Sequence, residues 1–191
     1  MTRSKEFDES AVLHKAMKLF WQQGYEKSSM QDLVTHMGIH RRSIYDTFGS
    51  KHALYLKALE RYGETVEDQI EKRLKSLDSV KQAIRRLFEM TIHRKETLPS
   101  GCLTVNTAVE LAEHDKEAMD RVLDSFSNTE NLLHELLLSG QKSGEISERH
   151  DAEKLSRFFN NSFVGLRVLA KTSNDMQKME DIVDTTLSVL D

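Results

Sequence analysis

The residues of this chain best suited to bind a charged ligand lie in one short stretch, GIHRRSIYDTF, at positions 38–48. Its two adjacent arginines, Arg41 and Arg42, carry planar guanidinium groups that pair with a phosphate or a guanine edge through two parallel hydrogen bonds. Three hydroxyl donors follow within the same stretch: Ser43, Tyr45 and Thr47. This combination of residue types predicts a surface that binds a polyanion.

Two short helices would position these side chains. Ser29 is a good N-cap and Asp32 follows three residues later, close to a capping box, so a helix is expected from residue 30 until Gly38 ends it. The arginine pair then opens a third helix at about 41–47, where the helix dipole disfavours cations unless a phosphate or base edge is near. Two short helices joined by a glycine turn form a helix-turn-helix, whose second helix enters the major groove of DNA.

The candidate DNA contacts extend to both sides of this third helix. Lys51 begins a fourth helix, where free backbone N–H groups also favour a phosphate. Asp46 would repel a phosphate, so we expect it either to orient Arg42 or to accept a hydrogen bond from a cytosine amine. Taken alone, an arginine pair on a short helix is usually only a solvated face. The full candidate interface is Ser29, Gln31, His40, Arg41, Arg42, Ser43, Tyr45, Thr47 and Lys51.

Composition predicts an all-α protein. The chain has 191 residues, of which 38% are hydrophobic and 30% charged, and it holds one proline. Its apolar residues recur at helical spacing rather than in alternating runs. The net charge of −4 is unevenly spread, because residues 1–61 hold ten Lys and Arg against seven Asp and Glu, whereas residues 62–191 hold seventeen against twenty-four. A basic first part on an acidic remainder suggests that the first part meets the polyanion.

The periodicity predicts about nine helices, arranged as a three-helix helix-turn-helix head on a larger C-terminal helical bundle. The first covers about 8–23, with Gly24 as a left-handed C-cap, and the fourth covers about 51–75. Further helices are expected from about residue 80, at 103–112, through Leu137, at 151–171 and at 175–190. We place the DNA-binding head at 1–50 and a helical body at 51–191, to which the family resemblance given below assigns effector binding and dimerisation. The fourth helix joins them without a flexible linker, so it can transmit movement.

The order of these features resembles the TetR family of bacterial transcriptional regulators. The resemblance is carried by AMKLFWQQGYEKSSMQDLVTHMGIHRRSIYDTFGSKHALY at residues 16–55, and the helix layout of the remainder agrees. It implies a homodimer whose two recognition helices enter successive major grooves of a pseudo-palindromic operator. It also implies a repressor that a small effector, bound among the middle helices, releases from double-stranded DNA.

The resemblance places the dimer interface in the last two predicted helices. Candidate interface residues are Phe163, Leu166, Ile182 and Leu187. Gly165 would let two helices approach closely. The alternative is that these apolar side chains form only the core of each chain.

The effector is not identified by the sequence. Candidate lining residues are Phe88, His93, Cys102, Asn106, Phe126 and Phe159, although residues of these types are more often ordinary core. Cys102 stands near the start of the sixth predicted helix, a position that favours the reactive thiolate. This segment resembles a branch of the family in which some regulators sense electrophiles or oxidants through a cysteine. An unreactive buried cysteine is the alternative.

Other functional classes lack their signatures in this chain. We find no Gly-rich dinucleotide motif, no P-loop and no HExxH zinc motif, and Gly38 interrupts the helix between His36 and His40. We therefore expect no enzyme, no cofactor and no metal. With one cysteine and no apolar run of membrane-spanning length, we expect a cytoplasmic protein without a membrane partner. The rival function is a helical scaffold or partner-binding protein without sequence-specific DNA binding, which salt dependence of DNA binding would distinguish.

Overall fold

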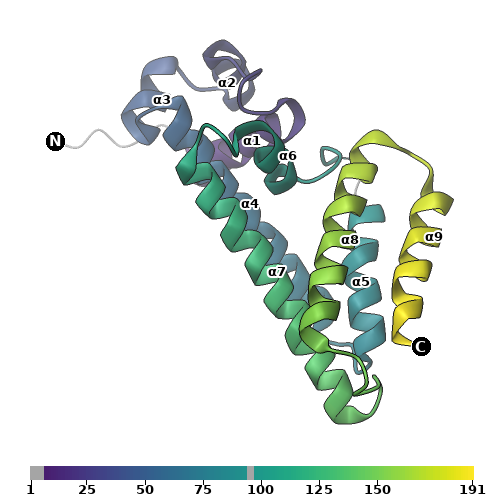
Figure 1. The fold of residues 1–191 in the computed structure, drawn as a ribbon. Helices are drawn as coiled ribbons and strands as arrows, with labels where there is room; N and C mark the ends of the chain where they lie inside the picture. Colours follow the sequence, from purple (N-terminus) through teal and green to yellow (C-terminus); the bar gives the residue numbers. More distant parts are fainter. Residues whose placement is uncertain (1–6, 94–96) are drawn as a thin grey trace.

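The computed structural model describes residues 7–93 and 97–191, and every regular element within them is helical (Figure 1). The predicted all-α class is confirmed, and the helix bounds lie close to the predicted ones. The helices are α1 (Glu9–Gln23), α2 (Met30–Met37), α3 (Arg41–Phe48), α4 (Lys51–Leu74), α5 (Val80–Ile92), α6 (Leu103–Leu111), α7 (Lys116–Ser143), α8 (Ala152–Thr172) and α9 (Met176–Leu187), followed by a 3-10 turn at Ser188–Leu190. None of the described helices combines the length and apolar composition needed to cross a lipid bilayer.

The helices form two groups that two long helices connect (Figure 1). Helices α1, α2 and α3 gather at one end of the molecule, and α5, α8 and α9 lie at the other. Helix α4, of 24 residues, packs along α7, of 28 residues, and both reach from one group to the other. The head is therefore attached through continuous helix.

Most helices begin at a residue whose side chain accepts a hydrogen bond from a first-turn N–H group. Ser29 and Asp32 form the capping box expected at α2. The other capped starts are Asp8, Ser50, Ser79, Asp115, Asp151 and Asp175. His40 and Cys102, which precede α3 and α6, make no side-chain cap. Both of these helix starts belong to the candidate sites described below.

Two apolar cores stabilise the two groups. The first joins α1, α2 and α3 to the first half of α4 and to α6, and it includes Tyr55 and Leu103. The second joins α5, α8 and α9 to the second half of α7, with Phe88 and Phe163 at its centre. Because the first core includes α4 side chains up to Tyr62, the packing does not divide at residue 50.

The turn after α1 is held by a carboxylate from α6. Glu110 accepts hydrogen bonds from the backbone N–H groups of Tyr25 at 3.0 Å and Glu26 at 2.8 Å. Gly24 has φ 86° and ψ 175°, so it is not the left-handed cap that we expected. The reason is distant in sequence, because this backbone aims the next two N–H groups at Glu110. A Cβ at Gly24 would lie only 2.7 Å from that carboxylate.

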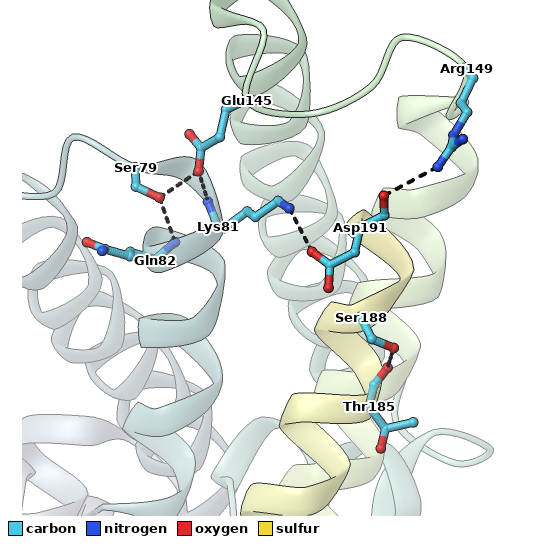
Figure 2. A network of polar contacts seen from close by, with 8 residues as sticks. All are labelled: Ser79, Lys81, Gln82, Glu145, Arg149, Thr185, Ser188 and Asp191. Atoms are coloured by element: carbon cyan, nitrogen blue, oxygen red, sulfur yellow. Dashed lines mark hydrogen bonds and ion pairs between the residues drawn. The ribbon is translucent and has the colours of Figure 1, made fainter.

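A second set of polar contacts closes the far end of the body (Figure 2). Glu145, after α7, accepts from the Ser79 hydroxyl at 2.5 Å and from the N–H groups of Val80 at 2.8 Å and Lys81 at 2.9 Å. The Lys81 ammonium reaches the Asp191 carboxylate at 2.8 Å. Glu145 thus supplies acceptors for the first turn of α5 from a loop 64 residues away along the chain.

We expect Glu145→Ala to lower the free energy of unfolding by about 1–2 kcal/mol at pH 7, as for loss of a helix cap. Burial alone would raise the pKa of Glu145, but the hydrogen bonds from Ser79, Lys81 and Val80 outweigh burial and keep the pKa below its usual value. The contribution is therefore present above the unfolded-state pKa of about 4.3 and is lost as pH falls through the lower folded-state pKa. Urea unfolding at pH 7 and pH 3 measures both effects.

The matched control is Glu148→Ala, which removes an exposed carboxylate from the same loop and should change stability by no more than about 0.5 kcal/mol. Equal losses in the two variants would contradict the role of Glu145. So would a deficit of Glu145→Ala that is as large at pH 3 as at pH 7.

Candidate nucleic-acid interface

The angle between α2 and α3 is set by one glycine and by apolar anchors on both helices. Gly38 adopts φ 74° and ψ 29°, the left-handed region that favours glycine, and its N–H group donates to the Val34 carbonyl. Leu33 of α2 and Ile44 of α3 are completely buried. The Lys15 ammonium of α1 donates to the Met37 carbonyl at 3.3 Å. Since these contacts hold the backs of both helices, the opposite face of α3 is left to the solvent.

The exposed face of α3 carries the arginine pair and the tyrosine. Arg41 and Arg42 are exposed, and Tyr45 is 43% exposed although it lies beside buried Ile44. The Arg42 Nε atom lies 3.5 Å from an Asp46 carboxylate oxygen, which is one of the two roles we considered for Asp46. Such an exposed pair contributes little stability, so its main effect is to limit the directions in which Arg42 points.

The remaining predicted contacts surround that face at different depths. Gln31 and His40 are exposed, while Ser43 and Thr47 are half-buried. The Ser29 hydroxyl donates to the Asp32 carboxylate at 2.6 Å and accepts from the Asp32 N–H group at 3.1 Å. Its hydroxyl is therefore occupied in capping α2, and Ser29 has less freedom to contact DNA than we expected.

Three lysines, Lys27, Lys51 and Lys57, lie in the chain segments before and after α2 and α3. The Lys51 ammonium lies 4.3 Å from the centre of the Tyr25 ring, a cation–π contact that holds this side chain against the head. Lys27 and Lys57 are also exposed in the same part of the chain, and we did not single them out from the sequence. Their positions in the sequence could have indicated them, because Lys27 lies two residues before Ser29 and Lys57 six residues after Lys51.

A cavity of about 460 Å³ lies where α1, α4, α5 and α8 meet. Of the six residues expected to line an effector site, His93 and Cys102 line this cavity. Trp21, Tyr62 and Arg167 also line it and were missed, because aromatic and charged residues at helical spacing show no common destination in a single sequence. Burial, together with the neighbouring Cys102, raises the pKa of Tyr62 well above its usual value, so its hydroxyl stays protonated.

The other four predicted effector residues lie elsewhere. Phe88 and Phe159 are completely buried in the second core, where their rings pack at a centroid distance of 6.2 Å. Phe126 packs, partly buried, against the first core. Asn106 donates to the Trp21 carbonyl at 3.3 Å and accepts from Lys171 at 2.9 Å. None of these four residues lines the cavity. They pack in the two cores or connect neighbouring segments by hydrogen bonds.

The residues predicted for dimerisation lie mostly inside the chain. Phe163 and Leu166 are each 2% exposed and Leu187 is 9% exposed, and all belong to the second core. Only Ile182 is partly accessible. In the single chain, Phe163 and Leu166 face inward, and their contact with a second copy stays a prediction. Phe158 and Val168 of α8 are instead 45% and 46% exposed.

The fold and the exposed face of α3 define a helix-turn-helix DNA-binding protein with a helical C-terminal domain. The family profile described as "Bacterial regulatory proteins, tetR family" matches residues 12–58, and that described as "Tetracyclin repressor-like, C-terminal domain" matches residues 80–186. The chain belongs to the TetR family of transcriptional regulators.

Relatives match along nearly the whole chain. It is 38% identical to the uncharacterized HTH-type transcriptional regulator YezE of Bacillus subtilis (strain 168), with 100% of both chains covered. It is 31% identical to the HTH-type transcriptional repressor ComR of Escherichia coli (strain K12), over 97% of this chain and 90% of that one. A solved structure of a cysteine mutant of the TetR family regulator CifR with a 26-base-pair operator superimposes with a TM-score of 0.90 at 27% identity, covering 99% and 100% of the two chains.

We predict that Arg42→Ala weakens binding to the operator duplex by about 1–3 kcal/mol if Arg42 reads a base. Fluorescence anisotropy with a labelled duplex at two salt concentrations measures this loss. Lys142→Ala, which removes an exposed cation at the far end of α7, is the control and should leave the affinity unchanged. A folded Arg42→Ala protein with wild-type affinity would rule out a role for Arg42 in base recognition.

Proposed function

We propose that this protein is a homodimeric repressor that binds a palindromic operator and is released from it by a small effector. The observation that carries the proposal is the face of α3, on which Arg41, Arg42 and Tyr45 are exposed while Ile44 and Phe48 hold the helix in place. Two such helices in one dimer would enter two major grooves about one helical turn apart. Acting on chromosomal DNA, the protein would work in the cytoplasm and without catalysis.

The names of the relatives support this direction of regulation. ComR is described as a transcriptional repressor, and the CifR structure contains double-stranded operator DNA. A scaffold protein, the rival function, would have no need of an exposed arginine pair at the uncapped start of α3. We therefore favour sequence-specific DNA binding over a scaffold role.

We propose a dimer interface on the outer face of α8 and α9. Phe158, Gly165 and Val168 follow one another at spacings of seven and three residues, so they share one side of α8, and all three are exposed. Apart from the chain neighbours of Gly165 and the backbone of α8 itself, no atom lies within 4 Å of the place where a Cβ on Gly165 would stand. This leaves room for a second helix. Ile182 of α9 lines a shallow groove together with Phe158, and it continues this apolar surface.

The cavity offers a route from effector to DNA. Trp21, near the end of α1, lines the cavity, and its ring N–H group donates to the Gly101 carbonyl at 3.3 Å. Gly101 directly precedes Cys102 and α6, whose Glu110 holds the turn between α1 and α2. An effector that shifts Trp21 or Gly101 would therefore move the head. By linkage, it must prefer the state that cannot bind DNA, and DNA must weaken its binding by the same factor.

Selection from a library of random duplex DNA at two salt concentrations tests the proposed function. Enrichment of an inverted repeat with half-sites about one helical turn apart is expected for a dimeric helix-turn-helix protein. Affinity for the selected duplex should fall steeply as salt rises, since phosphate contacts release counterions. A folded dimer that enriches no sequence would contradict DNA recognition and favour the scaffold role.

The proposed dimer face predicts the effect of a charge on it. Val168→Asp should convert the dimer to monomers, because a carboxylate would be buried without a partner in the interface. Leu123→Asp is the matched control, since Leu123 is 50% exposed on α7 and lies outside the proposed face. Sedimentation velocity distinguishes the two states. A Val168→Asp protein that remains dimeric would place the interface elsewhere.

A further inference from the structure

One arginine inside the body, Arg167, has no acidic partner among residues 7–93 and 97–191. Arg167 of α8 is only 8% exposed, and its guanidinium carbon lies 3.9 Å from the centre of the Phe163 ring. Within residues 7–93 and 97–191, no carboxylate lies within 4.0 Å of its guanidinium nitrogens, and this group makes no hydrogen bond. A buried cation normally requires a paired anion, because removing it from water is costly.

The cavity that Arg167 lines has an unusual charge for this part of the chain. Residues 62–191 hold more acidic than basic side chains, yet the described residues lining the cavity include Arg73 and Arg167, with His14 and His93, and no Asp or Glu. Low-dielectric walls strengthen such a field and attract a counter-ion of opposite sign. His93 lies 3.7 Å from the Glu180 carboxylate, and burial together with Lys18 and Arg61 lowers the pKa of His14, so the fixed positive charges of the described lining are Arg73 and Arg167.

The acidic residues of a second hollow that Arg167 borders do not remove this imbalance. Arg167 also borders a second, wider hollow of about 920 Å³ between α4 and α7, which is lined by acidic residues. These residues, Glu64, Glu67, Asp68, Glu71 and Glu135, are all exposed. Water and salt screen exposed charges, so they do not replace a direct partner for Arg167.

The rest of the cavity wall is suited to an apolar molecule. Trp21, Leu87 and Met90 line it, and its volume of about 460 Å³ falls within the usual range for small-molecule sites. We infer that this cavity binds a small organic acid, whose carboxylate pairs with the Arg167 guanidinium and whose apolar part lies against Trp21, Leu87 and Met90. The planar guanidinium accommodates a carboxylate through two parallel hydrogen bonds. The inference rests on the proposed function only in assigning the effector to this cavity.

The fluorescence of Trp21 tests this inference without DNA, because it is the only tryptophan of the chain and lines the cavity. The probes are benzoate, phenylacetate and octanoate, each compared with its uncharged amide of nearly equal shape. We expect at least one acid to change the fluorescence saturably, and its amide to bind about tenfold more weakly or worse, as for loss of a charged hydrogen bond. Absence of binding by all three acids, or equal affinity of acid and amide, would overturn the inference.

Substitution of Arg167 tests the residue itself. Arg167→Gln should weaken binding of the acid by about tenfold or more and leave binding of the amide unchanged, which also shows that the cavity is intact. Arg157→Gln, which removes a charge from an exposed position of α8, should bind the acid as the wild type does. If Arg167→Gln does not fold, Arg167→Lys replaces it, and severalfold weaker acid binding is expected from loss of the planar fork. Wild-type affinity for the acid in the folded variant would overturn the inference.

Operator binding separates failure of this inference from failure of the proposed function. An acid that binds through Arg167 but leaves operator affinity unchanged would support the ligand class and contradict its role as effector. An uncharged compound could change the Trp21 fluorescence and release the operator while none of the three acids binds. That result would support the proposed function and overturn the inference. Release by the acid, lost in Arg167→Gln, is the result expected when both hold.

Discussion

The joint between α6 and the end of α1 is the constraint on which the rest of the structure depends. Glu110 accepts hydrogen bonds from two successive backbone N–H groups after α1, and the Trp21 ring donates to the Gly101 carbonyl. These hydrogen bonds tie the backbone after α1 and the end of α1 itself to α6 and the segment before it, so they help to hold the helix-turn-helix at a defined angle to the body. A head on a flexible linker would lose that control.

Contacts near the same point offer a structural basis for coupling between the cavity and the DNA-binding head. The Tyr55 hydroxyl of α4 lies 2.8 Å from the Thr107 hydroxyl of α6, and His52 lies 2.7 Å from Asp115 at the start of α7. These contacts connect the start of α4, which follows the recognition helix, to the segment that borders the cavity. Under the proposed function, a change at the cavity would reach the head through packed helices and hydrogen bonds, which is a physical basis for coupling two ligands.

Local features of the fold were predictable because their causes are local. The capping box of Ser29 and Asp32 and the end of α2 at Gly38 depend on residues within one helical turn, and the sequence predicted both, although not the left-handed conformation of Gly38. The conformation of Gly24 was not predictable, because it depends on a contact with Glu110. That carboxylate accepts from the N–H group of Tyr25, a residue 85 positions earlier in the chain. Long-range contacts of this kind leave no pattern in the neighbouring residues.

The candidate site was predictable to a similar extent. The exposed arginines of α3 follow from its short amphipathic pattern, in which Ile44 and Phe48 must turn inward. The proposed dimer face was not predictable, because α8 has apolar residues on two sides and periodicity does not say which side the chain itself covers. Phe163 lies on the covered side and Val168 on the open one. That Arg167 has no acidic partner among the described residues became visible only once its neighbours were known.

The most direct measurement is a crystal structure of the dimer bound to its selected operator duplex. The account predicts that α3 of each protomer lies in a major groove, with Arg41 and Arg42 contacting bases or phosphates. It also predicts that Glu110 still accepts the two N–H groups after α1. A complex in which α3 lies outside the groove, or in which the head binds DNA after separating from α6, would contradict it.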